Sequence, residues 1–409
     1  MKTVAFLTLG CKLNYAETST YERAFAGAGW EVVSWRDKAD LYLVNTCSVT
    51  AVSDAKSRNL IRKVHRINPV AEILVTGCSA QLRKDEILGI EGVTAVFGAT
   101  AKGDILSLAK GERSGCGTET LAAWSSGERT RSFLKVQDGC SNYCAYCTVP
   151  YARGESRNIP IAECVANAHR IASLGIKEIV ITGVNTGDFG RTTGEPFLDL
   201  LKALNGVEGI ERYRISSIEP NLLTEEIIDW AASGTKFQPH FHIPLQTGSD
   251  TLLKRMGRRY DTEFFASRIE YIRKAFEGPG KPKVFFGIDV MAGLPGETDE
   301  LFEESEAFIK RIRPAFIHVF PYSRRPGTPA ASMSGQVGEE KKKERVAALE
   351  ELCGELHREF IESNAGVSEK VLFESSRKGG YMEGYTGNYI RVRRPYDPSL
   401  VNTLTDVIL

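Results

Sequence analysis

The sequence lacks a long apolar run, a signal-peptide pattern and a net charge. No apolar run approaches the ~18 residues of a membrane-spanning helix, so we expect no membrane association. Residues 1–9 hold one lysine and a short apolar stretch, which is not the pattern of a signal peptide. The formal net charge is +0 at pH 7, so any nucleic-acid site must be a local basic patch.

Cysteine is scarce, but it carries the most information. The 409 residues include nine cysteines. In a long chain without a signal peptide, this number predicts a reducing, cytoplasmic compartment and cysteines that serve metals or catalysis rather than disulfides. Cys116 lies in a Gly/Ser-rich stretch, and Cys164 and Cys353 lie in helical patterns, so we expect none of these three to be a ligand. The remaining six are candidate ligands: Cys11, Cys47, Cys78, Cys140, Cys144 and Cys147.

Three of the candidates fall within one short loop, residues 139–147, with spacings of four and then three residues. Tetrahedral zinc normally takes four protein ligands, and this loop supplies three. An iron–sulfur cubane held by three cysteines keeps one iron free for a small molecule. The alternatives are a zinc knuckle without its fourth ligand and three cysteines that are close by chance.

The first part of the chain, about residues 1–112, alternates strand and helix patterns. Strands are expected at residues 4–9, 41–44, 73–76 and 95–97, with helices at 14–28 and 52–67. This rhythm predicts an open parallel α/β sheet. Cys11, Cys47 and Cys78 each follow the carboxyl end of a strand, which is the edge where such sheets bind ligands. They therefore predict a second cluster with an open iron, although small buried cysteines also pack at loop starts.

The rest of the chain divides into a linker, a central domain and a short tail. Residues 113–131 are rich in Gly, Ser and Thr and are expected to be a linker. Residues 132–365 hold about six strand–helix units, with strands at 133–136 and strands ending near residues 182, 217, 244, 290 and 320, which predicts a partial (β/α) barrel. The helix at 339–363 has a core-facing apolar stripe.

Polar residues at the strand ends of the predicted barrel are candidates for cofactor binding, because barrels keep their chemistry there. A carboxylate such as that of Glu219 could hold ribose hydroxyls, and each residue alone could equally be ordinary turn chemistry. Arg153 and Arg157 follow the cysteine loop and are candidates for contact with an anionic group. The strand-end candidates are Gly183, Asn185, Ser216, Glu219, Gln246 and Asp289.

Two basic regions are candidates for RNA contact. Residues 366–409 are predicted to form short strands, a small all-β module in which Arg391 and Arg393 share one face. Tyrosines at 381, 385 and 389 would add stacking surfaces. The helix after Cys47 carries Arg58 and Arg62 beside the predicted site. These arginines either contact RNA phosphates or belong to an ordinary solvent-exposed face of the helix.

The order of these motifs resembles the radical S-adenosylmethionine (SAM) methylthiotransferases over nearly the whole chain. "FLTLGCKLNYAETS", "VNTCSVTAVSDAKSR", "VTGCSAQ" and "VQDGCSNYCAYCTVPYARGESR" match the family pattern. The run Gly10-Cys11-Lys12-Leu13-Asn14 looks like the branch acting on N6-threonylcarbamoyladenosine of tRNA. The isopentenyladenosine branch tends to have Gln-Met after this cysteine, and the ribosomal-protein aspartate branch tends to have Pro-Lys.

The resemblance implies two 4Fe–4S clusters and SAM as both methyl donor and radical source. Cys140, Cys144 and Cys147 would hold the radical-generating cluster, and Tyr146 would lie against the SAM adenine. The other three candidate cysteines would hold the cluster that carries or supplies sulfur. The tail resembles the first part of the RNA-binding TRAM module.

The resemblance also implies partners. We expect a tRNA substrate, an electron donor such as flavodoxin or ferredoxin, and a monomeric enzyme. The open alternatives are another modified adenosine, a ribosomal-protein aspartate, or a non-catalytic Fe–S protein that binds RNA or passes electrons. Electron carriers usually close each cluster with four cysteines, which argues against the last.

Overall fold

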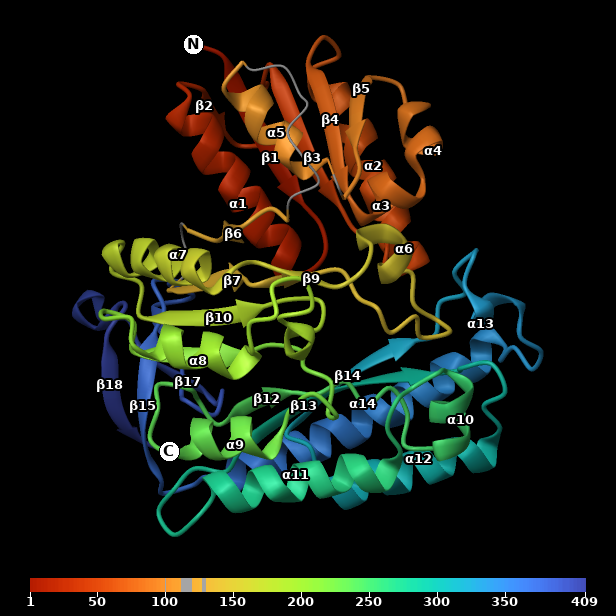
Figure 1. Ribbon diagram of the computed structural model, residues 1–409, viewed down its shortest axis with the longest axis vertical. Helices are drawn as coiled ribbons and strands as arrows, with labels where there is room; N and C mark the ends of the chain where they lie inside the picture. The colour runs from red at the N-terminus through yellow and green to blue at the C-terminus, as the bar shows by residue number, and fades with distance from the viewer. Residues whose placement is uncertain (100, 112–119, 127–129) are drawn as a thin grey trace.

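The computed structural model describes residues 1–99, 101–111, 120–126 and 130–409. An N-terminal α/β domain sits over a larger central domain, and the C-terminal strands lie against one end of the central domain (Figure 1). The N-terminal domain consists of β1 Thr3–Thr8, α1 Lys12–Gly27, β2 Glu31–Val33, β3 Leu41–Thr46, α2 Ala51–Ile67, β4 Glu72–Gly77, α3 Cys78–Leu82, α4 Lys84–Leu88, β5 Val93–Phe97 and α5 Lys102–Ala109.

The N-terminal strands form a parallel sheet in the order β2-β1-β3-β4-β5. Strand β3 is buried along its whole length, because apolar clusters cover both faces of the sheet. In this order the chain reverses direction across the sheet between β1 and β3, which is the switch point where open α/β sheets bind ligands. The predicted open sheet is confirmed. Strand β2 was not predicted, because it is short and two of its three residues are exposed.

The central domain begins with a strand inside the stretch that was expected to be a linker. Strand β6 pairs antiparallel with β7. Trp124 of β6 lies under the guanidinium of Arg23, 3.5 Å from ring centroid to Cζ, so this stretch joins the two domains. The elements are β6 Ala123–Trp124, β7 Arg131–Lys135, β8 Gln137–Asp138, α6 Val149–Arg153, β9 Arg157–Asn158, α7 Ile161–Ser173, β10 Glu178–Thr182, η1 Thr186–Asp188, α8 Phe197–Asn205, β11 Arg212–Ile215, α9 Glu225–Ala232, β12 His240–His242, α10 Asp250–Arg255, α11 Thr262–Phe276, β13 Phe285–Ala292, α12 Asp299–Ile312, β14 Phe316–Pro321, α13 Pro329–Ser332 and α14 Glu339–Glu362.

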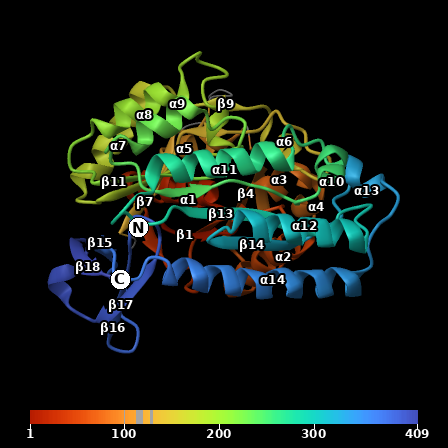
Figure 2. The same ribbon diagram turned by 90° about the horizontal axis from the view of Figure 1, so that it is seen from below.

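The strands β7, β10, β11, β12, β13 and β14 form the curved wall of a partial barrel. Strands β7, β10 and β11 pair in parallel, as do β12, β13 and β14. The backbone N–H of Ile218 donates to the carbonyl of His242 and joins the two groups. One apolar core joins the strands to the outer helices, which Figure 2 shows along the wall. The predicted six-unit barrel is confirmed.

Alternation along the strands decides which residues face the barrel lumen. In β13, Ile288 and Val290 belong to the core under the helices, so Asp289 between them points to the opposite face. The same alternation turns Lys135, Arg214 and His318 inward. The N-terminal domain covers the open side between β7 and β14. There Arg325, just after β14, donates to Ser48 Oγ at 2.9 Å and pairs with Asp54 of α2.

The C-terminal strands form an antiparallel sheet in the order β17-β16-β15-β18, as expected for a TRAM-like module. The sheet closes the end of the barrel at which the strands begin: Arg131 donates to Tyr389 Oη at 2.8 Å and pairs with Glu374 at 2.7 Å. Tyr385 and Tyr389 therefore contact the barrel instead of offering the expected stacking surfaces. The bounds are β15 Ser368–Phe373, β16 Tyr381–Tyr385, β17 Arg391–Pro395, η2 Pro398–Leu400 and β18 Leu404–Ile408.

Helix α14 runs along the central domain with Leu349, Leu352 and Leu356 in the core, as its sequence stripe predicts. Among the described residues, no helix combines the length and apolar character needed to cross a membrane.

Candidate functional site

The first trio of cysteines lies at one edge of the N-terminal sheet. Cys47 and Cys78 follow β3 and β4 directly, and Cys11 follows β1 after Leu9 and Gly10. The thiols of Cys11 and Cys78 both act electrostatically on that of Cys47. Gly10 has a positive φ of 106°, and a Cβ there would lie 3.1 Å from the sulfur of Cys47. Position 10, next to Cys11 in the chain and packed against Cys47, therefore requires glycine. The structure brings the trio together at the sheet's switch point, as the sequence predicts.

The second trio lies in the loop after β8, at the carboxyl ends of the barrel strands. Burial is the main cause that raises the pKa of Cys140 to about 11 and that of Cys147 to about 12, and the trio's own charges add to both shifts. The backbone N–H of Val149 donates to the sulfur of Cys147 at 3.4 Å. Gly139 has a φ of 72°, and a Cβ there would meet the carbonyl of Glu155 at 2.0 Å, so the loop requires glycine before its first cysteine.

All cysteines in the described part of the chain are free thiols, so neither trio is consumed by disulfides. Cys164 and Cys353 are buried in the core and stand apart from both trios, as expected. Cys116 lies outside the described residues. The result is two separate sets of three thiols.

Arg258 is a site residue that the sequence analysis missed. It donates to the sulfur of Cys144 at 3.1 Å and to the hydroxyl of Tyr146 at 3.3 Å, and it binds both carboxylate oxygens of Glu219. Arg258 follows α10 in a "GRRY" run that has no distinctive spacing, and only the fold brings it to the cysteine loop. It fixes Tyr146 and Glu219, two of the predicted cofactor contacts, beside the second trio.

The other predicted cofactor residues gather around the same strand ends. Asn185 accepts a hydrogen bond from the Glu219 backbone at 3.3 Å, while its buried side-chain Nδ2 has no partner in the described structure. Gly183 stands against Gln137, with room for no Cβ, and Ser216 is buried just after β11. Gln246 has a φ of 73° and is bound through its backbone to β13. Asp289 lies deeper, within β13, and pairs with His242.

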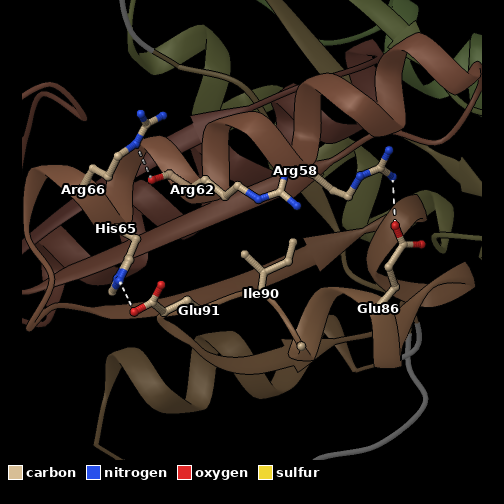
Figure 3. A pocket seen from close by; sticks show the side chains of 8 residues that line it. Arg58, Arg62, His65, Arg66, Glu86, Ile90 and Glu91 are labelled. Carbon is tan, nitrogen blue, oxygen red and sulfur yellow. Dashed lines mark hydrogen bonds and ion pairs between the residues drawn. The ribbon is translucent and has the colours of Figure 1, made fainter.

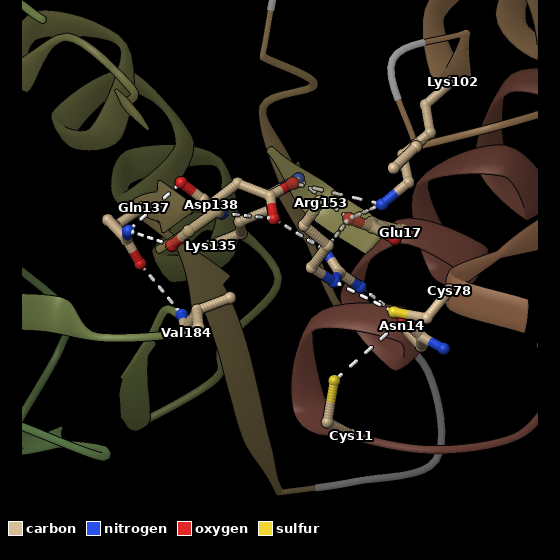
Figure 4. Close-up of polar contacts among 12 residues, drawn as sticks. Cys11, Asn14, Glu17, Cys78, Lys102, Lys135, Gln137, Asp138, Arg153 and Val184 are labelled. Carbon is tan, nitrogen blue, oxygen red and sulfur yellow. Dashed lines mark hydrogen bonds and ion pairs between the residues drawn. The ribbon is translucent and has the colours of Figure 1, made fainter. Parts of the chain in front are cut away.

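Arg153 links the two trios. It lies in α6, just after the second trio, and its Nε donates to the sulfur of Cys78 at 3.3 Å (Figure 4). It also binds Asn14 at 2.5 Å and Asp138 at 2.8 Å. Its exposed fraction is 2%. The anionic groups that Arg153 contacts are therefore the protein's own carboxylates, Asp138 and Glu17, instead of a bound ligand.

The contacts of Arg153 belong to a buried ionic cluster between the domains, drawn in Figure 4. Glu17 accepts from Lys102 at 2.7 Å, from Lys135 at 2.8 Å and from Arg153 at 3.3 Å. Burial favours the neutral form of Glu17, but the three cations hold its pKa well below the usual value. The cluster thus fixes the N-terminal domain on the barrel with both trios at the interface.

Replacing Arg153 with methionine is expected to lower the free energy of unfolding by about 3 kcal/mol, because a buried cluster that loses one partner leaves uncompensated charge. The measurement is thermal unfolding of the purified protein followed by circular dichroism. Arg358→Met on the exposed face of α14 is the matched control and should stay within about 0.5 kcal/mol of wild type. Equal melting temperatures for the two variants would contradict the role given to the cluster.

The candidate RNA contacts lie at two places. Arg391 and Arg393 are both exposed on β17, as the alternation predicts, and Arg393 stacks on Tyr381 with 4.2 Å from Cζ to the ring centroid. Arg58 and Arg62 line a pocket on α2 together with Arg66 and His65 (Figure 3). Arg62 is exposed, whereas Arg58 pairs with Glu86 at 3.2 Å.

The double variant Arg391→Gln/Arg393→Gln is expected to bind tRNA more weakly and with less salt dependence. If both arginines meet phosphates, the slope of log K against log salt should become shallower by about 2. Fluorescence anisotropy of labelled tRNA at several salt concentrations measures this. An unchanged slope would remove both residues from the RNA interface.

Comparison with known proteins agrees with this geometry. Residues 3–98 match "Uncharacterized protein family UPF0004", and residues 134–309 match the radical SAM superfamily. The threonylcarbamoyladenosine tRNA methylthiotransferase MtaB of Bacillus subtilis is 40% identical over 96% of this chain and 90% of its own length. MtaB of Aquifex aeolicus is 36% identical over 96% of both chains. This chain belongs to the radical-SAM methylthiotransferase family.

Solved structures support the fold of this methylthiotransferase. The radical SAM methyltransferase TsrM from Kitasatospora setae superposes with a TM-score of 0.60 at 15% identity, over 81% of this chain and 75% of that one. At this identity the likeness shows the fold alone.

Enzymes of this family use SAM and 4Fe–4S clusters. The residues of this methylthiotransferase fit such groups. Within the described residues, each trio offers three free thiols and no fourth, which would leave one iron of a cubane open. The unpartnered Nδ2 of Asn185 and the carboxylate of Glu219 lie at the strand ends beside the second trio, where a bound SAM could accept and donate hydrogen bonds.

Proposed function

We propose that this chain converts N6-threonylcarbamoyladenosine next to the anticodon of tRNA into its 2-methylthio derivative. The observation that carries the proposal is similarity over nearly the full length to several relatives named for this reaction, at 31–40% identity. The two separate cysteine trios at one domain interface support it, because the family's reaction needs one site for SAM cleavage and one for sulfur.

We propose residue roles that are consistent with the positions of the side chains. Cys140, Cys144 and Cys147 hold the cluster that cleaves SAM, and Tyr146, Asn185 and Glu219 bind the SAM nucleoside. When bound, the two clusters and SAM supply a 5′-deoxyadenosyl radical and the methylthio group. Arg258 orients Tyr146 and Glu219 through the hydrogen bonds described above. Gly183, Ser216 and Gln246 complete the strand-end contacts.

The second set of roles concerns sulfur and RNA. Cys11, Cys47 and Cys78 hold the sulfur-bearing cluster, and Arg153 keeps Cys78 in place through its 3.3 Å hydrogen bond. Arg391, Arg393, Arg58 and Arg62 contact the RNA. The proposed domains are residues 1–112, the N-terminal methylthiotransferase domain, and residues 132–365, the radical SAM core, with residues 113–131 as the linker between them. Residues 366–409 form the TRAM-like RNA-binding module. An electron donor such as flavodoxin or ferredoxin supplies electrons to a monomeric, cytoplasmic enzyme.

The direct test incubates the reconstituted protein with an anticodon stem–loop that carries threonylcarbamoyladenosine, together with SAM, sulfide and dithionite. Mass spectrometry of the digested nucleosides should show the methylthio derivative. Formation of 5′-deoxyadenosine without a methylthiolated nucleoside would contradict the proposed substrate.

A second substrate has support of its own. The tRNA-2-methylthio-N(6)-dimethylallyladenosine synthase of a Wolbachia from Brugia malayi is 31% identical over 98% of this chain. A stem–loop with that nucleoside belongs in the same experiment. The higher identity of 40% to an MtaB protein favours the threonylcarbamoyl substrate.

A further inference from the structure

Lys12 has surroundings that set it apart from the other cations of the domain interface. It is the first residue of α1, directly after Cys11, and its side chain is exposed. It lies near enough to Arg131, Arg214 and Asp289 of the barrel for their charges to act on its ammonium group. Lys12 therefore reaches from the N-terminal domain into the barrel lumen.

Lys12 faces a polar cluster on three neighbouring strands. His242 Nε2 lies 3.0 Å from Asp289 Oδ1, and the rings of His242 and His318 are 5.2 Å apart, centroid to centroid. The nitrogen and oxygen atoms that the three side chains can offer all lie within 4.8 Å of one another. Asp289 and His318 are paired in register on β13 and β14. The cluster thus forms one polar patch on the lumen face.

The other lumen cations already have partners. Arg214 binds both oxygens of Glu178, at 2.8 and 3.2 Å, and Arg131 binds Glu374 at 2.7 Å. Within the described part of the chain, Lys12 forms no ion pair within 4.0 Å and no hydrogen bond of its side chain. An ammonium group that faces the barrel and has no partner among the described residues favours an anion from a bound ligand.

We propose that Lys12 binds the carboxylate of the threonylcarbamoyl group, and that His318 and Asp289, which His242 holds in place, hydrogen-bond its hydroxyl and ureido groups. The inference rests on the proposed function and assigns the specificity of that same site. The substituent carries one anion for the unpaired lysine and several polar atoms for the patch, whereas an isopentenyl group offers neither an anion nor a polar atom. Asp289 then acts on the RNA substituent rather than on SAM.

A divalent cation is the competing occupant, since two histidines and a carboxylate are common metal ligands. The charges around the patch disfavour it, because Lys12 brings to the same lumen a positive charge that no carboxylate of the described residues pairs with, and it acts on His318. In addition, His242 shares its Nδ1 with Ser217 Oγ at 2.7 Å and its Nε2 with Asp289, so both of its nitrogens are already engaged.

The test compares two stem–loops, one with threonylcarbamoyladenosine and one with its methyl ester, which removes the anion. For the reconstituted wild-type enzyme, esterification should lower kcat/KM for methylthiolation about 100-fold, as expected when a desolvated charge pair loses one member. Lys12→Gln should lose about 100-fold on the acid and respond to esterification by less than about threefold. The exposed Lys38→Gln is the matched control and should behave as wild type.

Two further readouts separate the causes of failure. Iron content and 5′-deoxyadenosine formation without RNA show whether Lys12→Gln has disturbed the neighbouring cluster. If either value falls in Lys12→Gln, the variant His318→Gln is used instead, because His318 is remote from both cysteine trios in the sequence. Its kcat/KM on the acid RNA should be at least about tenfold lower than that of wild type. Competition binding of acid against ester RNA reports the role of Lys12 even if wild type forms no product, an outcome that would sink only the proposed reaction.

The inference is overturned if Lys12→Gln keeps the wild-type preference for acid over ester in both turnover and binding. It is also overturned if Zn²⁺ or Mn²⁺ binds the reconstituted wild-type protein with one equivalent beyond the iron and this equivalent is lost in His318→Ala, since the patch would then be a metal site.

Discussion

Cys144→Ala is expected to abolish the formation of 5′-deoxyadenosine from SAM and dithionite, together with all methylthiolation. Cys144 is the middle residue of the loop trio, and its sulfur accepts the hydrogen bond from Arg258. A cubane that loses one of three ligands has no protein bond to replace it, because the described cysteines near the loop are only these three. The readouts are chromatography of 5′-deoxyadenosine and mass spectrometry of the nucleosides.

The matched control for this variant is Cys353→Ser. Cys353 is equally buried, but it lies under α14, where its sulfur accepts from the Ile317 N–H at 3.2 Å. Serine keeps this hydrogen bond, so the variant should form 5′-deoxyadenosine at the wild-type rate. SAM cleavage by Cys144→Ala at that same rate would remove the loop from the radical chemistry.

Cys47→Ala is expected to separate the two halves of the reaction. Cys47 belongs to the N-terminal trio, so SAM cleavage at the other trio should continue within about threefold of wild type, as for independent sites. Methylthiolated nucleoside should fall to background, because the protein can no longer hold the sulfur-bearing cluster. A single incubation with threonylcarbamoyl RNA, analysed for both products, measures the split.

The control for Cys47→Ala is the loop variant Cys144→Ala in the same incubation, which loses both products. If Cys47→Ala keeps the methylthio product, sulfur does not come from a cluster at this trio. If it loses SAM cleavage as completely as Cys144→Ala does, the two trios do not act as separate sites.

The architecture was predictable where local periodicity in the sequence marks the helices and strands. Short apolar runs marked the strands, and each of Cys11, Cys47 and Cys78 stood at a strand end, so the sheet edge followed from the fold class alone. The loop trio was visible from its spacing. The module after residue 366 was equally visible as short strands, and its exposed arginines alternate as expected.

The rest depends on contacts between distant residues, which no local pattern records. Arg258 reaches Cys144 across more than a hundred residues, and Arg153 meets Glu17 from the other domain. Tyr389 was expected to offer a stacking surface for RNA because the tail combines tyrosines with arginines. Its ring centroid instead lies 4.9 Å from that of His240, where Tyr389 helps to close the barrel. Lys12 was distinctive only as a family signature until the fold placed it opposite Asp289.

Quantitative iron and acid-labile sulfide analysis of the anaerobically reconstituted protein tests the central claim, two separate three-cysteine cluster sites, most directly. Wild type should hold about eight irons per chain, and each variant with one whole trio replaced by alanine should hold about four, as for two four-iron clusters. A wild-type content of about four, or loss of all iron when either trio is removed, would contradict the account.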